Sequence, residues 1–158
     1  MEQDKLTSRP VGEHRKAVQL VAEEDASLSS GSLRLYAWPI NSSPAVEGAP
    51  SVAKSEKSSP FVGCIDLYSY DPLNRRCAVG IMVATDYRRK GYALAMLHAL
   101  EKQYSGKIHC LYADIAATNT ASQALFRKAG YTECGRFKEW LEYDSHFIDN
   151  IRMQLILK

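Results

Sequence analysis

The stretch Val79–Ala93, VGIMVATDYRRKGYA, joins an apolar run typical of a β-strand to a polar turn and then to an amphipathic helical pattern. A strand that opens through such a turn into a helix leaves N–H groups of the first helical turn without intrahelical partners, and the helix dipole adds positive potential there. Gly91 lets the backbone approach a ligand closely, and Arg88, Arg89 and Lys90 add positive charge. The turn is therefore predicted to bind an anion, best a phosphate or pyrophosphate.

A β-hairpin is predicted directly before this turn. The segments 61–68 and 75–83 are both typical of strands, and Asp71-Pro72-Leu73-Asn74 between them has the composition of a turn, where proline is favoured early. After the turn, apolar residues at helical spacing predict a helix from about residue 89 to residue 104.

The C-terminal part repeats the alternation of strands and helices. Residues 108–115 are predicted to form a strand, and residues 119–130 a short helix with Asn119 as its N-cap and Gly130 just after its end. Two more strands are predicted over 131–143 and 147–157. A strand–helix–strand unit inside an otherwise antiparallel arrangement predicts an α/β mixed sheet with one parallel pair.

The N-terminal third carries weaker patterns. Residues 15–24 are predicted to form a helix, and the alternation over 33–38, which ends at Pro39, predicts a strand. Residues 41–59 are rich in Ser, Pro and Ala with almost no large apolar side chain, so a mobile loop is expected there. We expect one domain over 1–158, with an irregular, shortened part over 1–59 and a core over 60–158.

Composition limits the classes of function. A net charge of +2 is too small to favour nucleic acid or an anionic membrane as a partner. No apolar run approaches the roughly 20 residues that span a bilayer, and the first residues lack the layout of a signal peptide, so a cytoplasmic location is expected. The four cysteines lie far apart without a C-x-x-C pair, so we expect reduced thiols and no metal site.

Two motifs in this order resemble one known family. Arg88-x-x-Gly91-x-Ala93 after a strand resembles the pyrophosphate-binding signature of the GNAT superfamily of N-acetyltransferases. Asn119-Thr120-Ala121-Ser122-x-x-Leu125-Phe126-x-Lys128-x-Gly130-Tyr131 resembles the family's second element, which lines the pantetheine arm of coenzyme A. From about residue 61 onward the chain looks like this fold, and most like the branch that acetylates ribosomal-protein N-termini and polyamines.

The resemblance implies acetyl-CoA (coenzyme A) as cosubstrate and assigns residues to it. The backbone N–H of Val83, at the end of its strand, matches the family's donor to the tetrahedral oxyanion. The residues that the resemblance places against the cosubstrate are Met82, Val83, Arg88, Arg89, Lys90, Gly91, Tyr92, Ala93, Asn119, Ser122 and Phe126.

The chain departs from the family at both usual proton-transfer positions. Phe126 stands where a general-acid tyrosine is common, and Ala78 where a glutamate is common, so neither can exchange a proton. Asp66, a carboxylate in an apolar strand, is the candidate base or amine-binding residue, although an outward-pointing strand residue is an equal alternative. Tyr68 and Tyr112 also lie near the expected cleft, where packing in the sheet is their simplest role.

The leading hypothesis is direct transfer of an acetyl group from acetyl-CoA to a primary amine, either a small molecule such as a polyamine or a peptide amino terminus. The alternative is a GNAT-like protein that binds acetyl-CoA with little or no turnover and acts as a sensor or assembly partner. A different phosphate-binding module is disfavoured, because the G-x-x-x-x-G-K-[ST] and G-x-G-x-x-G loops are absent from the sequence. An exposed late strand also makes a homodimer plausible.

Overall fold

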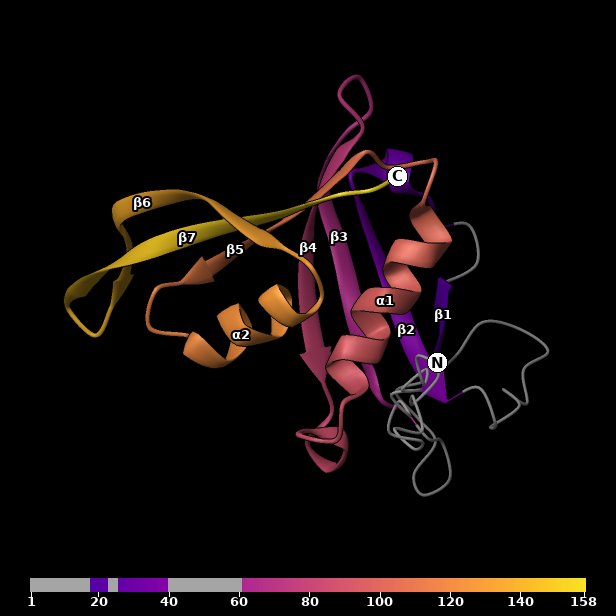
Figure 1. Cartoon of the computed structure of the whole chain (residues 1–158), viewed down its shortest axis with the longest axis horizontal. Helices are drawn as coiled ribbons and strands as arrows, with labels where there is room; N and C mark the ends of the chain where they lie inside the picture. The colour runs from indigo at the N-terminus through magenta and orange to yellow at the C-terminus, as the bar shows by residue number, and fades with distance from the viewer. Residues whose placement is uncertain (1–17, 23–25, 40–60) are drawn as a thin grey trace, which may run out of the picture.

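The structure, a computed structural model, describes residues 18–22, 26–39 and 61–158. Its strands join in one sheet in the order β1-β2-β3-β4-β5-β7-β6 (Figure 1). The strands are β1 Val18–Ala22, β2 Ser32–Pro39, β3 Gly63–Asp71, β4 Arg76–Val83, β5 Cys110–Ala116, β6 Thr132–Tyr143 and β7 His146–Ile156. All neighbouring pairs are antiparallel except β4 and β5, which are parallel. The predicted mixed sheet with one parallel pair is confirmed.

The first described strand corrects a prediction. Residues 15–24 were expected to form a helix, but Val18–Ala22 is β1 and pairs antiparallel with β2. Val18 and Leu20 are buried, whereas Gln19 and Val21, which alternate with them, are more exposed. This alternation has the period of a strand, and pairing with β2 outweighs the helical tendency of the flanking charged residues. The remaining residues of the predicted helix lie outside the described part.

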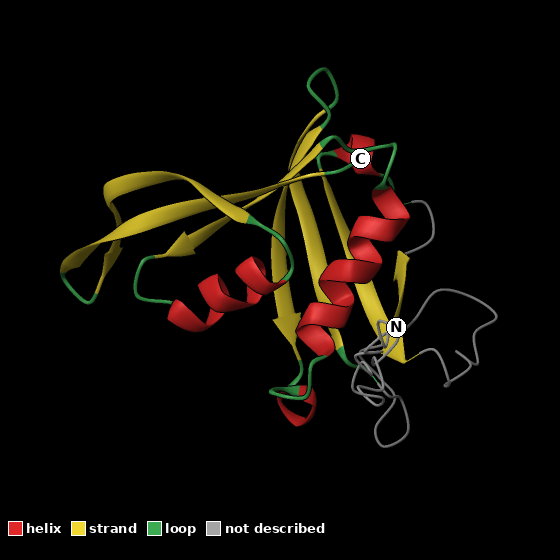
Figure 2. Cartoon of the chain, in the orientation of Figure 1, coloured by secondary structure: helices red, strands yellow, loops and turns green. Residues whose placement is uncertain are grey.

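Two helices cover one face of the sheet (Figure 2). They are α1, Tyr92–Tyr104, and α2, Thr120–Lys128, and they contact each other. Helix α1 buries Met96 and Leu100 against side chains of the central strands, which include Leu35 and Ile65. These four side chains are fully buried, so removing their apolar surface from water stabilises the packing of α1 on the sheet.

The start of α1 lies later than the sequence pattern indicates. The helix was expected from about residue 89, but it begins at Tyr92, and the short 3-10 helix η2, Thr85–Tyr87, precedes it. Arg89 and Gly91 have φ angles of 57° and 83°, both in the left-handed region. A right-handed helix cannot run through such residues, so the chain turns here instead.

The other predicted elements are confirmed within a few residues at each end. The strand over 33–38 is the centre of β2, and the hairpin over 61–83 is formed by β3 and β4. Asp71 closes the turn of this hairpin, because its carboxylate accepts hydrogen bonds from the N–H groups of Leu73 and Asn74. The last two predicted strands are β6 and β7.

We call the face of the sheet opposite α1 and α2 the open face. It carries polar side chains such as Arg34 and Asp66, which are next in sequence to the buried Leu35 and Ile65. Between β1 and β2, the described residues hold the 3-10 helix η1, Leu28–Ser30. The shortened N-terminal part over 1–59 stays a prediction, because most of it lies outside the described residues. The expected mobile loop over 41–59 lies outside the described residues. Within those residues, no helix has the length and apolar composition that crossing a membrane requires.

Candidate active site

The parallel strands β4 and β5 separate partway along their length, and this divergence opens the candidate site. Their register runs only from Arg76 opposite Cys110 to Ala78 opposite Tyr112. Beyond Ala78, β4 continues to Val83 beside β3, whereas β5 follows β7 in a different direction (Figure 1). We call this V-shaped opening between β4 and β5 the splay, and the row at Ala78 its apex.

Backbone groups of β4 face into the splay. The N–H of Ala84 donates to the carbonyl of Val62 on the β3 side (2.8 Å), and backbone groups alternate in direction along a strand. The N–H and C=O of Val83 therefore point away from β3. The guanidinium Nε of Arg88 donates to this Val83 carbonyl (2.9 Å), which leaves the Val83 N–H as a donor directed at the splay.

The turn after β4 has the geometry of an anion site. Gly91 is the N-cap of α1 with φ 83° and ψ 4°. The first hydrogen bond of helix α1 runs from the N–H of Ala95 to the carbonyl of Gly91 (3.2 Å). The N–H groups before Ala95 therefore have no partner within the helix, and they lie at the positive end of a helix of 13 residues. Met82, on the strand before the turn, is half exposed.

The charged residues of the turn divide into two roles. Arg88 is tied to Val83 and so stabilises the turn itself. Arg89 and Lys90 are exposed, and no ion pair among the described residues includes either of them. Their side chains are available to an anion at the start of α1. Tyr92 places its ring edge-on against Tyr87, with 5.2 Å between centroids.

The second motif begins at the far end of β5. The side chain of Asn119 accepts a hydrogen bond from the N–H of Ser122 (3.1 Å), which confirms Asn119 as the N-cap of α2. The buried side chain of Gln123 donates to the carbonyls of Ala116 and Ala117, at 3.3 and 2.9 Å. These bonds fix the start of α2 to the end of β5, on the other arm of the splay from Val83.

Phe126 belongs to the core in this structure. Its side chain is 3% exposed, and its ring packs edge-on against that of Tyr131 with 4.9 Å between centroids. This packing explains why a phenylalanine is stable at the position. Contact between Phe126 and a cofactor arm stays a prediction.

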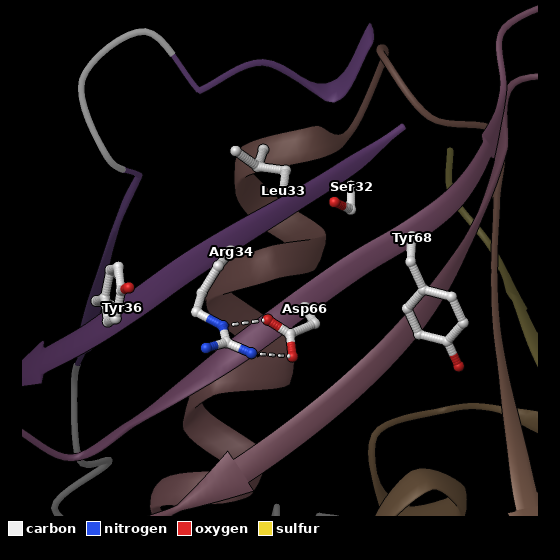
Figure 3. Close-up of a pocket in the computed structure, with 6 residues that line it drawn as sticks. All are labelled: Ser32, Leu33, Arg34, Tyr36, Asp66 and Tyr68. Carbon is white, nitrogen blue, oxygen red and sulfur yellow. Dashed lines mark hydrogen bonds and ion pairs between the residues drawn. The ribbon is translucent and has the colours of Figure 1, made fainter. Parts of the chain in front are cut away.

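Asp66 lies in a pocket on the open face of the sheet. Arg34 of β2 is directly opposite it and donates two hydrogen bonds to its carboxylate, at 2.6 and 2.9 Å (Figure 3). This ion pair raises the pKa of the Arg34 guanidinium. The pocket has a volume of about 460 Å³, within the range of small-molecule sites. Its lining residues are Ser32, Leu33, Arg34, Tyr36, Asp66 and Tyr68.

A second ion pair lies across the splay from Asp66. Arg152 of β7 donates two hydrogen bonds of 2.8 Å to Asp114 of β5. Its guanidinium also lies 4.5 Å from the ring centroid of Tyr112. Asp66 and Asp114 are thus each held by an arginine, a feature that the sequence analysis missed because the partners are far apart in the chain.

The predicted site residues therefore form two groups. Val83 and the residues of the turn, 88–93, lie at the end of β4, whereas Asn119 and Ser122 lie at the end of β5. Asp66 is separate from both, on the open face beside the apex. Among the described residues, no group of His, Cys, Asp and Glu side chains could hold a metal ion.

Comparisons with known proteins agree with this geometry. The family model described as acetyltransferase (GNAT) domain matches residues 9–132, which is most of the chain. No curated protein sequence matches the chain.

The fold is similar to that of several solved acetyltransferases. Spermidine N-acetyltransferase from Vibrio cholerae, in complex with CoA and spermine, aligns with a TM-score of 0.65 and 16% identity over 81% of this chain and 67% of that one. RimL, the ribosomal L7/L12 alpha-N-protein acetyltransferase in complex with coenzyme A, aligns with a TM-score of 0.65 and 17% identity, over 82% of this chain and 64% of its own. This chain thus spans about two thirds of each.

The match over residues 9–132 and the splayed parallel pair lead to the same conclusion. The chain belongs to the GNAT family of acetyltransferase domains.

Proposed function

We propose that this protein transfers the acetyl group of acetyl-CoA to a primary amine. The observation that carries the proposal is the splay: an unpaired strand edge with the Val83 N–H directed into it, beside an anion-binding turn at Gly91. The described residues from Phe61 onward supply both of these parts.

In this proposal, the described residues would bind the parts of acetyl-CoA in order along the splay. The pyrophosphate would bind at the start of α1, against the backbone around Gly91 and the side chains of Arg89 and Lys90. The pantetheine arm would run between β4 and the start of α2, where Asn119 and Ser122 lie. The thioester carbonyl would then accept a hydrogen bond from the Val83 N–H, which stabilises negative charge on that oxygen as the amine attacks.

The acceptor amine would approach from the open face. The pocket that contains Arg34 and Asp66 lies on this face, next to the apex of the splay. Because Asp66 and Asp114 are each paired with an arginine, the described residues of this face offer no excess of negative charge for a polycation. A peptide amino terminus or a small monoamine therefore suits the described part of the site better than a polyamine. A role for Asp66 in holding the amine remains part of the proposal.

The competing proposal is a protein that binds acetyl-CoA with little turnover. The observation in its favour is the absence of a proton-transferring group at both usual positions, where Ala78 and the buried Phe126 stand. The two proposals share the cosubstrate and differ only in catalysis, so one assay can separate them.

The assay measures release of the free CoA thiol and the mass of the acceptor, with acetyl-CoA plus either spermidine, a monoamine or a short peptide with a free amino terminus. We expect acetylation of at least the peptide or the monoamine. Arg88→Ala should weaken it, because the bond that orients the turn is lost. Arg127→Ala, which removes an exposed arginine of α2 beside Glu133, is the matched control and should leave activity unchanged. Tight binding of acetyl-CoA with no acetylated product would support the competing proposal.

A further inference from the structure

One row of side chains crosses the open face of the sheet at the apex of the splay. Tyr68 of β3 is directly opposite Ala78 of β4, and Ala78 is directly opposite Tyr112 of β5. Residues directly opposite each other in a sheet project to the same face, so these three side chains lie side by side. The pair Ala78–Tyr112 is the last before the strands separate, and Tyr68 is therefore the residue of β3 nearest the apex.

The ring of Tyr68 lies over the next open-face residue of β4, which is a glycine. A Cβ at Gly80 would be 3.7 Å from Cε1 of the Tyr68 ring. The ring extends across β4, away from the Arg34–Asp66 pair (Figure 3). A β-bulge follows Tyr68 immediately, with Ser69 at φ 51°, and bulges of this kind redirect neighbouring side chains. Because Ala78 has only a methyl group and Gly80 has no Cβ, the Tyr68 ring can lie over this part of β4.

Tyr68 brings a phenolic hydroxyl to the apex row, and the groups around it set the pKa of that hydroxyl. Burial raises the pKa of Tyr68, and the nearby carboxylate of Asp114 raises it further, whereas the Arg152 guanidinium lowers it. The phenol is therefore neutral near pH 7, and it can accept a proton on oxygen while it donates its own.

We propose that the Tyr68 hydroxyl carries the proton from the attacking amine to the departing thiolate, in place of the acid and base that Phe126 and Ala78 cannot provide. This inference rests on the proposed function. The amine nitrogen forms a bond to the thioester carbon, the carbon–sulfur bond breaks, and its electron pair goes to sulfur. Tyr68 gives its proton to sulfur and regains one from the nitrogen, so that the products are an amide and the free thiol of CoA.

The test is the Tyr68→Phe variant, which keeps the ring over Gly80 and removes only the hydroxyl. We expect kcat for acetylation of the peptide or the monoamine to fall by about 10²-fold or more, which is the scale of general acid–base catalysis. The affinity for acetyl-CoA should stay unchanged. Tyr112→Phe is the matched control, because it removes a hydroxyl from the same row, and it should retain kcat.

The outcomes separate this inference from the function on which it rests. A wild-type protein that acetylates the probes, with a Tyr68→Phe variant of equal kcat, would overturn the role of Tyr68 and leave the function intact. An equal loss in both variants would also overturn it, since that would indicate a general effect of polarity on this face. A wild-type protein that binds acetyl-CoA but acetylates none of the probes would remove both proposals. An intact affinity for acetyl-CoA in the Tyr68→Phe variant checks that the variant is folded.

Discussion

The Gly91→Val substitution should reduce the affinity for acetyl-CoA while the protein stays folded. Gly91 is the N-cap of α1 with φ 83°, where a β-branched residue is strained, although a Cβ there would meet nothing within 4 Å. The added side chain would project into the space that a pyrophosphate needs for close approach to the backbone. The substitution therefore lowers stability through backbone strain, and it weakens binding because the new side chain blocks the pyrophosphate.

The two effects have different magnitudes. Strain at a left-handed position costs on the order of 1–3 kcal/mol, which lowers Tm by roughly 2–12 °C for a chain of this size. A lost hydrogen bond to a charged group costs about 1.5–3 kcal/mol, so Kd for acetyl-CoA should rise by roughly 10- to 150-fold. Thermal unfolding and calorimetric titration measure the two effects separately.

Gly106, just beyond the opposite end of α1, provides a matched control. Its φ is 81°, and a Cβ there would also meet nothing within 4 Å. Gly106→Val should therefore lower Tm by a similar amount and leave the affinity for acetyl-CoA unchanged. Equal affinity of the Gly91→Val and wild-type proteins would refute the assignment of the turn as the phosphate site.

Three further predictions follow from the contacts. Asp66→Asn should reduce kcat with little change in acetyl-CoA affinity, because it disrupts the pair with Arg34 on the acceptor face; full activity would remove Asp66 from the site. Asn119→Ala should lower the free energy of unfolding by about 1 kcal/mol, measured by urea titration, since the N–H of Ser122 loses its cap; an unchanged unfolding midpoint would contradict this. Burial raises the pKa of the Cys77 thiol from 9.0 to about 11, so the unfolded state loses this proton first and stability should fall between pH 9 and 11. Cys77→Ala should make that fall smaller, and an identical pH profile would argue against this thiol as its cause.

Local rules explain which parts of the fold could be predicted. The turn around Gly91 and the cap at Asn119 depend on a few consecutive residues, and both lie where the sequence pattern placed them. Both the β3–β4 hairpin and the β6–β7 pair join strands that are adjacent in the sequence, so alternation and turn residues were sufficient.

The features that sequence patterns missed are non-local. Strand β1, Val18–Ala22, is short and has charged residues on both sides in the sequence, so its formation depends on pairing with β2, which the local pattern does not reveal. Arg34 and Asp66 are separated by 32 positions, and their ion pair depends on the register of β2 against β3. The position of Tyr68 at the apex likewise depends on the register across three strands.

The measurement that tests the central claim most directly is calorimetric titration of the purified protein with acetyl-CoA, with ATP as the comparison. The splay and the turn together predict micromolar binding of acetyl-CoA and none of ATP, because ATP has phosphates for the turn but no arm to lie along β4. Absence of acetyl-CoA binding, or equal binding of both compounds, would contradict the account.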